Sequence, residues 1–173
     1  MNKWLGLAKR IDAFSRWTGI VCSYLIIPLT LLVVYEVVTR SFQHPTIWTF
    51  EMSNFFYGAH FMLVAAYGLL YKSHVTIDLF SGRFSKKTQA ILSLICYIFM
   101  YFPFIAVFLY FGFSYSLNSW SMMEKSWSIW GPPLYPIKTV IPITAVMLLL
   151  QGISEVIKTV DVVFQERGGA HES

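Results

Sequence analysis

Residues 90–113 read AILSLICYIFMYFPFIAVFLYFGF, a run of 24 residues that contains no charged side chain. A membrane-spanning α-helix needs about 20 predominantly apolar residues to cross a hydrocarbon layer about 30 Å thick. Because lipid offers the backbone no hydrogen-bond partners, a run of this length is expected to be helical. This stretch alone predicts an integral membrane protein.

Three further apolar runs, at 18–38, 50–71 and 139–157, are 21, 22 and 19 residues long. The segments that remain are too short to bury a hydrophobic core of their own. Aromatic residues make up 18% of the chain and charged residues 13%, which fits a membrane protein better than a soluble enzyme. We therefore expect an all-α, integral membrane four-helix protein that forms a single membrane domain over 1–173, with no enzymatic activity.

The basic residues are divided unequally between the two ends of these four runs. Short loops with an excess of Lys and Arg stay on the cytoplasmic side. Ten of the 13 basic residues fall at one end, whereas only Arg40, Lys125 and Lys138 fall at the other. Both termini are therefore predicted to be cytoplasmic, with loops 39–49 and 114–138 outside. The net charge of +4 thus indicates orientation and contact with membrane lipids, and we expect no nucleic-acid binding.

Two segments beside the apolar runs mix apolar and polar residues. In 1–17, apolar residues such as Trp4 are interleaved with basic ones such as Lys9, a pattern typical of an amphipathic helix on the inner membrane surface. A frayed, positively charged tail is the alternative. The loop 72–89 predicts a second short interfacial segment.

Cys22, Cys96 and His60 lie inside the apolar runs. The cysteines are not in a CxxC arrangement, so they are expected to be buried in apolar packing within the chain and not to form a disulfide. A histidine inside a membrane invites a proton-relay or haem hypothesis. A single histidine cannot ligate haem from two helices, and a hydrogen bond to a neighbouring helix is the better interpretation.

Charged residues at the ends of the runs are the candidate site residues. Glu36 and Arg40 are one helical turn apart at the outer end of the first run, and Glu51 begins the second run close by. We expect a structural ion-pair cluster, and an ion-coupling or proton-carrying carboxylate is the alternative. His74 and Asp78 are also four residues apart, but two ligands are too few for a metal site. They are interpreted as capping or interfacial contacts.

The outer loop 114–138 is rich in Trp, Tyr and Pro. Trp and Tyr favour the membrane–water interface, so most of these aromatic residues are expected to form an interfacial belt. A face that docks another protein is the alternative. The prolines stop helix formation and set an extended or turned path into the fourth run.

The order of these residues resembles that in the small membrane subunit of tripartite ATP-independent periplasmic (TRAP) transporters, the DctQ-type family. The resemblance covers nearly the whole chain, and its specificity comes from the order of short pieces relative to the four runs. The pieces are Glu36-x3-Arg40, Trp48-x2-Glu51, Gly68, His74-Val75-x2-Asp78, Glu124-x-Ser126, Pro133, Pro136-x-Lys138, Pro142 and Gln151-Gly152. The C-terminal pieces are most similar to the branch associated with 2-oxo acids and related carboxylates.

The resemblance implies a multi-pass protein of the bacterial inner (cytoplasmic) membrane, in a stable complex with a large TRAP membrane subunit. That subunit would carry solute inward on a sodium gradient, after a periplasmic solute-binding protein has captured it. The small subunit would be a scaffold without catalytic, substrate-binding or metal-binding residues and without a cofactor, because sodium coupling is expected in the large subunit. The structural or interface residues would be Glu36, Arg40, Trp48, Glu51, His74, Asp78, Glu124, Pro133, Pro136 and Lys138.

Two other classes of membrane protein remain as alternatives. Within the redox class, a thiol–quinone oxidoreductase needs paired outer cysteines, which Cys22 and Cys96 cannot supply. A haem or quinone anchor subunit of a membrane redox complex needs several intramembrane histidines, whereas the apolar runs contain one, His60. A self-sufficient small exporter needs a carboxylate deep in a span, whereas Glu36 and Glu51 lie near an end.

Overall fold

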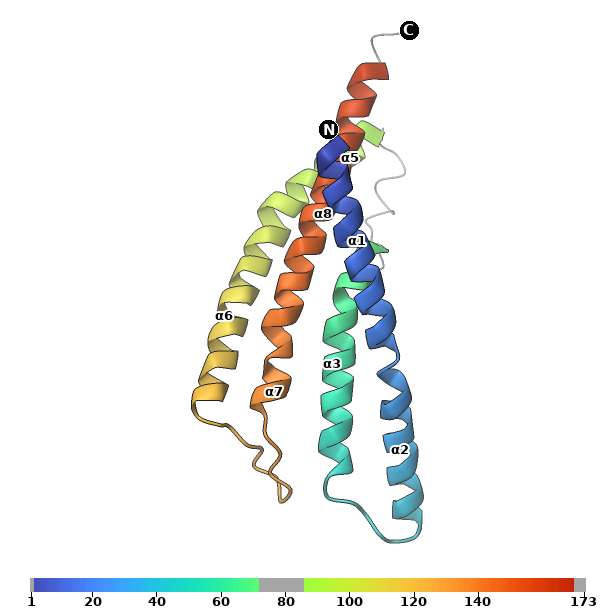
Figure 1. Ribbon diagram of the computed structural model, residues 1–173, viewed down its shortest axis with the longest axis vertical. Helices are drawn as coiled ribbons and strands as arrows, with labels where there is room; N and C mark the ends of the chain where they lie inside the picture. Colours follow the sequence, from blue (N-terminus) through green and yellow to red (C-terminus); the bar gives the residue numbers. More distant parts are fainter. Residues whose placement is uncertain (1, 72–85, 170–173) are drawn as a thin grey trace.

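The protein folds into a bundle of long helices (Figure 1). The structure, a computed structural model, describes residues 2–71 and 86–169. The chain begins with two helices placed end to end, α1 (Asn2–Ser23) and α2 (Ile26–Ser41), and then turns back in α3 (Thr49–Leu70). We call the end of the bundle at which both termini lie the inner end, and the opposite end the outer end.

The second half of the bundle begins with one continuous helical stretch. It consists of α5 (Lys86–Cys96), a π-helical turn η1 (Tyr97–Tyr101) and α6 (Phe102–Ser121). The short α7 (Tyr135–Lys138) then leads into α8 (Val140–Gly169), which returns to the inner end. For the described residues the all-α prediction is confirmed.

The break between α1 and α2 falls at Tyr24 and Leu25, and Pro28 explains it. Proline has no backbone N–H, and its ring collides with the carbonyl four residues earlier, which here belongs to Tyr24. That carbonyl instead accepts a hydrogen bond from Ile27 N at 3.0 Å, and Leu25 N donates to Cys22 O at 3.1 Å. The helix therefore switches to three-residue hydrogen bonds at this point and then resumes.

Helix α8 lies at the centre of the bundle and packs against α1, α3, α5 and α6. Close approach depends on small residues, as is usual between membrane helices. A methyl group at Gly152 of α8 would come within 2.3 Å of the Tyr101 ring, and one at Gly19 of α1 would come equally close to Tyr67. The Tyr101 hydroxyl also donates to Leu148 O at 2.8 Å, so η1 is fixed against α8.

Among the described residues, three helical stretches are long and apolar enough to cross a membrane, namely Lys3–Ser41, Thr88–Ser121 and Tyr135–Phe164. They account for three of the four predicted spans. The second predicted span does form a helix, α3, within about one residue of its expected bounds. Helix α3 is not among these three stretches, so its crossing of the membrane stays a prediction.

The predicted ends of the other spans need correction, because all three helices continue past the apolar runs. Residues 2–17 do not form a separate interfacial helix but are the first four turns of α1. The third helix reaches Ser121, so the outer loop is 122–134 and not 114–138. The fourth extends to Gly169. Hydropathy locates the part of a helix that suits lipid, whereas polar residues prolong the helix wherever water or a neighbouring helix satisfies them. Most of the second predicted interfacial segment, 72–89, lies outside the described residues.

Candidate functional site

The ion pair predicted at the outer end of α2 is present. Arg40 Nε lies 2.8 Å from Glu36 Oε1, one helical turn away on the same face. The other carboxylate oxygen of Glu36 accepts a hydrogen bond from the Thr46 hydroxyl, which also contacts the hydroxyl of the fully buried Thr49. Glu36 therefore binds Arg40 with one carboxylate oxygen and the loop between α2 and α3 with the other.

Glu51 has a different partner from the one its position suggested. The hydroxyl of Ser126, in the loop after α6, donates to Glu51 Oε1, whereas Arg40 pairs with Glu36. The second carboxylate oxygen, Glu51 Oε2, is buried and has no hydrogen-bond partner among the described residues. Glu51 thus connects the start of α3 to the outer loop and is not a third member of the Glu36–Arg40 pair.

The ring of Trp48 also connects the start of α3 to the outer loop. Its centroid lies 6.0 Å from that of Tyr35 on α2 and 6.5 Å from that of Trp130 in the outer loop. Aromatic pairs at such distances are favourable beyond the area they bury. Trp48 and Glu51 together therefore join α2, α3 and the loop 122–134.

The outer loop is folded into a short hairpin, and its prolines suit that path. Lys125 and Pro133 face each other as an isolated antiparallel bridge. Ser126 N donates to Pro132 O, and Leu134 N donates to Glu124 O, both at 2.9 Å. Pro136, which cannot donate a backbone hydrogen bond, sits in the first turn of α7, where no such bond is needed.

Glu124 and Lys138 close the base of this hairpin. Lys138 Nζ donates to Glu124 Oε2, and it also lies 4.1 Å from the centroid of the Tyr115 ring. The hydrogen bond from the Lys138 ammonium holds the pKa of the Glu124 carboxyl below its usual value. The ends of α6 and α7 are therefore linked by charge as well as by backbone contacts.

His60 occupies the middle of α3 and faces α1. Its Nδ1 lies 3.0 Å from the Cys22 carbonyl oxygen, next to the break between α1 and α2. A carbonyl can only accept, so Nδ1 must carry the proton in this contact. The predicted hydrogen bond to a neighbouring helix is confirmed. Both cysteines are free thiols, but Cys96 is exposed on the bundle surface, so the expectation that it packs inside this chain is wrong.

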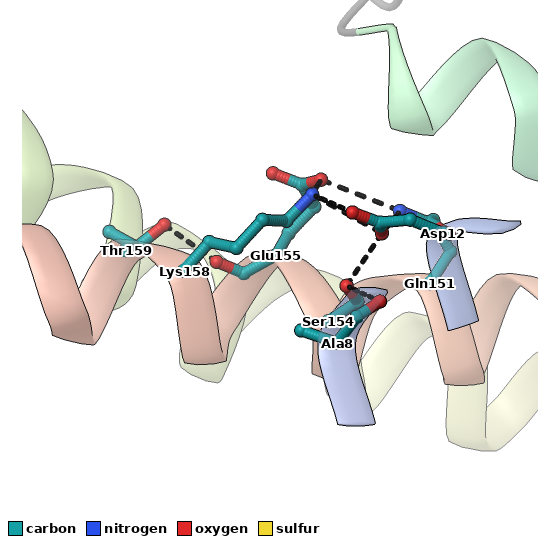
Figure 2. Close-up of polar contacts among 7 residues, drawn as sticks. All are labelled: Ala8, Asp12, Gln151, Ser154, Glu155, Lys158 and Thr159. Atoms are coloured by element: carbon teal, nitrogen blue, oxygen red, sulfur yellow. Dashed lines mark hydrogen bonds and ion pairs between the residues drawn. The ribbon is translucent and has the colours of Figure 1, made fainter. Parts of the chain in front are cut away.

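A second polar network joins α1 to α8 near the inner end (Figure 2). Asp12 is its common acceptor: Oδ1 lies 3.0 Å from Gln151 Nε2 and 2.7 Å from Ser154 Oγ, and Oδ2 lies 3.1 Å from Lys158 Nζ. Lys158 also pairs with Glu155, whose side chain is only 5% exposed. We call these five residues the inner network. Two carboxylates therefore share one ammonium group, and the lysine that carries it is partly exposed.

The sequence analysis did not identify four of these five residues, although two signals were present. Asp12 is the one acidic residue among four basic ones in the first 17 positions. Gln151, Ser154, Glu155 and Lys158 recur at intervals of three and four, which places them on one face of a helix. No sequence signal indicates that residue 12 meets a helix about 140 positions later.

His74 and Asp78 lie outside the described residues, so their capping or interfacial contacts stay predictions. Across residues 2–71 and 86–169, no group of three or more His, Cys, Asp or Glu side chains is placed to hold a metal ion. The carboxylates of the two ends are bound by Arg, Lys, Ser, Thr or Gln side chains. These hydrogen bonds and ion pairs hold the helices and loops together.

Residues 29–161 match the family model described as "Tripartite ATP-independent periplasmic transporters, DctQ component". The match includes Glu36, Glu51 and Lys138 of the outer end and Gln151 of the inner network, but it begins after Asp12. No curated protein matches the chain.

Proposed function

This chain belongs to the DctQ family of TRAP transporters, and we propose that it is the small membrane subunit of a sodium-driven secondary transporter for organic acids. In this proposal it acts in the bacterial inner membrane as a scaffold for the large transport subunit. The large subunit receives the solute from a periplasmic solute-binding protein and carries it across the membrane.

The observation that carries the scaffold role is the apolar surface that this chain leaves without a packing partner. Helix α2 contributes no buried residue. Leu31 and Val37 on α2 are 64% and 60% exposed, and Phe104 and Tyr110 on α6 are 66% and 71% exposed. Faces of this kind can receive helices of a larger membrane protein without any change in the core around α8.

The paired polar groups of the bundle support the same role, because their partners belong to this chain. His60 is bonded to a backbone carbonyl, and the carboxylates of both ends have partners. A helix that lines a solute path would present polar groups to a cavity. The groove between α2 and α3 is instead lined by residues such as Pro28, Leu31 and Trp48.

Affinity purification of the full chain in mild detergent, followed by identification of what co-purifies, tests the scaffold role. The expected result is a stable complex with one large multi-span permease. In liposomes, sodium-dependent uptake of a radiolabelled carboxylate should require this chain, the permease and the soluble receptor together.

Two results would contradict this proposal. Uptake by liposomes that contain only this chain would favour a self-sufficient transporter. Co-purification of haem or quinone with an oxidoreductase would favour an anchor subunit of a redox complex.

A further inference from the structure

One flank of α1 is exposed over several turns and changes character along the helix. Arg10, Phe14, Trp17 and Val21 are spaced four, three and four residues apart, so they lie on one face. Trp17 is 65% exposed, Phe14 48% and Val21 47%. Lys3 stands two turns before Arg10 on the same flank. The flank therefore runs from two cations at the inner end to three large apolar side chains.

The orientation of this flank is fixed by the opposite face of α1. Ala8, Ser15 and Gly19 on that face are buried against the bundle. Asp12 ties the same face to α8 through the inner network. Because α1 cannot rotate without breaking these contacts, the cations and the aromatic residues keep one register with respect to each other.

Neither of the two cations is paired with an acidic side chain in the part of the chain that the structure describes. None of the four ion pairs found among residues 2–71 and 86–169 includes Lys3 or Arg10. Both residues are exposed. Eleven residues separate Arg10 from Val21, about 16 Å at the rise of an α-helix. This length is close to the hydrocarbon thickness of one leaflet, about 15 Å.

We propose that this flank of α1 is a binding site for one anionic phospholipid of the inner leaflet. Its phosphate lies at Arg10 and Lys3, and its acyl chains lie along Phe14, Trp17 and Val21. A charged head followed by an apolar tail of one leaflet's length is the chemistry of a phospholipid. A transmembrane helix of a partner would match an apolar face without two cations at one end. This inference does not depend on the identity of the large subunit.

The test uses the purified full chain with any subunit that it retains, and a matched pair of charge variants. Lys9 is adjacent to Arg10, is also exposed, and points about 100° away around the helix. Phosphatidylglycerol and phosphatidylcholine are titrated into the detergent-solubilised protein, and bound lipid is counted by native mass spectrometry. Arg10→Gln should raise the phosphatidylglycerol concentration needed for half-occupancy about fivefold, which corresponds to one basic residue near an anionic surface. Lys9→Gln should leave it nearly unchanged.

A second readout reports the acyl chains. Phosphatidylglycerol with brominated acyl chains should quench the fluorescence of Trp17. The Trp17 contribution is the difference in quenching between the wild type and a Trp17→Phe variant. The proposal is overturned if phosphatidylcholine binds as well as phosphatidylglycerol, or if Arg10→Gln and Lys9→Gln weaken binding equally, since net charge alone would then explain it. It is also overturned if Arg10→Gln releases a protein subunit while lipid occupancy is unchanged.

Discussion

The two ends of the bundle hold their charged residues in different ways. At the outer end, Glu36, Glu51 and Glu124 each have a separate partner, and Arg40 is 65% exposed. At the inner end, Asp12 and Glu155 share a single ammonium group inside one network. The outer contacts fix loops to the helix ends, whereas the inner network joins the first helix to the last.

Exposure to water separates the Glu36–Arg40 pair, in which the arginine side chain is 65% exposed, from the inner network, in which the Glu155 side chain is 5% exposed. An exposed ion pair contributes little, because water solvates each charge nearly as well as the partner does. A charge that is shielded from water and then loses its partner is strongly destabilising. We therefore expect removal of Lys158 to damage the fold, whereas removal of the exposed Arg40 should act mainly on loop position.

The largest expected difference between the ends is their accessibility from outside the cell. In a chain with Cys22 and Cys96 replaced by alanine, Ile129→Cys should react with a membrane-impermeant thiol reagent in intact cells, and Gly6→Cys should not. Ile129 is 91% exposed on the hairpin, and Gly6 has open space around it. Ser119→Cys is the control for burial on the outer side, because Ser119 is only 1% exposed. The reverse labelling pattern would contradict the predicted orientation.

Removing the shared cation of the inner network should have the largest effect on stability. Lys158→Met leaves Asp12 and Glu155 close together without a counter-charge, which should cost about 2 kcal/mol, less than for a fully buried pair because Lys158 is partly exposed. Thermal unfolding in detergent measures this loss of stability. Adding Asp12→Asn to Lys158→Met removes one of the two carboxylates and should recover part of it. Wild-type stability of Lys158→Met would show that the inner network does not hold α1 against α8.

Breaking the Glu36–Arg40 ion pair should reduce stability less than Lys158→Met does, and its main effect should be on assembly of the complex. Arg40→Ala leaves Glu36 with the Thr46 hydroxyl but without its cation, and it should reduce subunit yield or retention of the complex in detergent. Glu36→Gln should be milder, because a neutral amide can still accept a hydrogen bond from Arg40. If Glu36→Gln leaves assembly intact but alters the sodium or proton stoichiometry of transport, then Glu36 belongs to the coupling mechanism and the scaffold interpretation is wrong.

Acid should loosen the hairpin, and this is the smallest expected effect. The Lys138 contact lowers the pKa of Glu124 below its ordinary value of 4.5. The stabilisation is therefore fully present above pH 4.5 and is lost as the pH falls through the lowered value. Tryptophan fluorescence, followed from pH 6 downward, should shift in the wild type toward the spectrum of Glu124→Gln. A Glu124→Gln spectrum identical to that of the wild type at pH 6 would mean that this pair does not position the hairpin.

The outer end was the more predictable of the two, and the reason is distance along the chain. Glu36 and Arg40 are four residues apart in one helix, so helical geometry alone brings them together. The partner of Glu51 was not predictable in this way, because Ser126 is 75 positions away and belongs to a loop. The inner network shows the same limit more strongly, since its contacts cross about 140 positions.

What the sequence by itself determined is therefore local: the apolar runs that must be helical in lipid, the Glu36–Arg40 turn, and the break that Pro28 imposes between α1 and α2. Only the tertiary structure decided which helix lies at the centre, and that α1 continues inward as part of the bundle. That outcome depends on Gly19 and Gly152 allowing close packing and on Asp12 meeting α8. Contacts of this kind arise between segments whose separation along the chain carries no periodicity, so they exist only once the helices have packed.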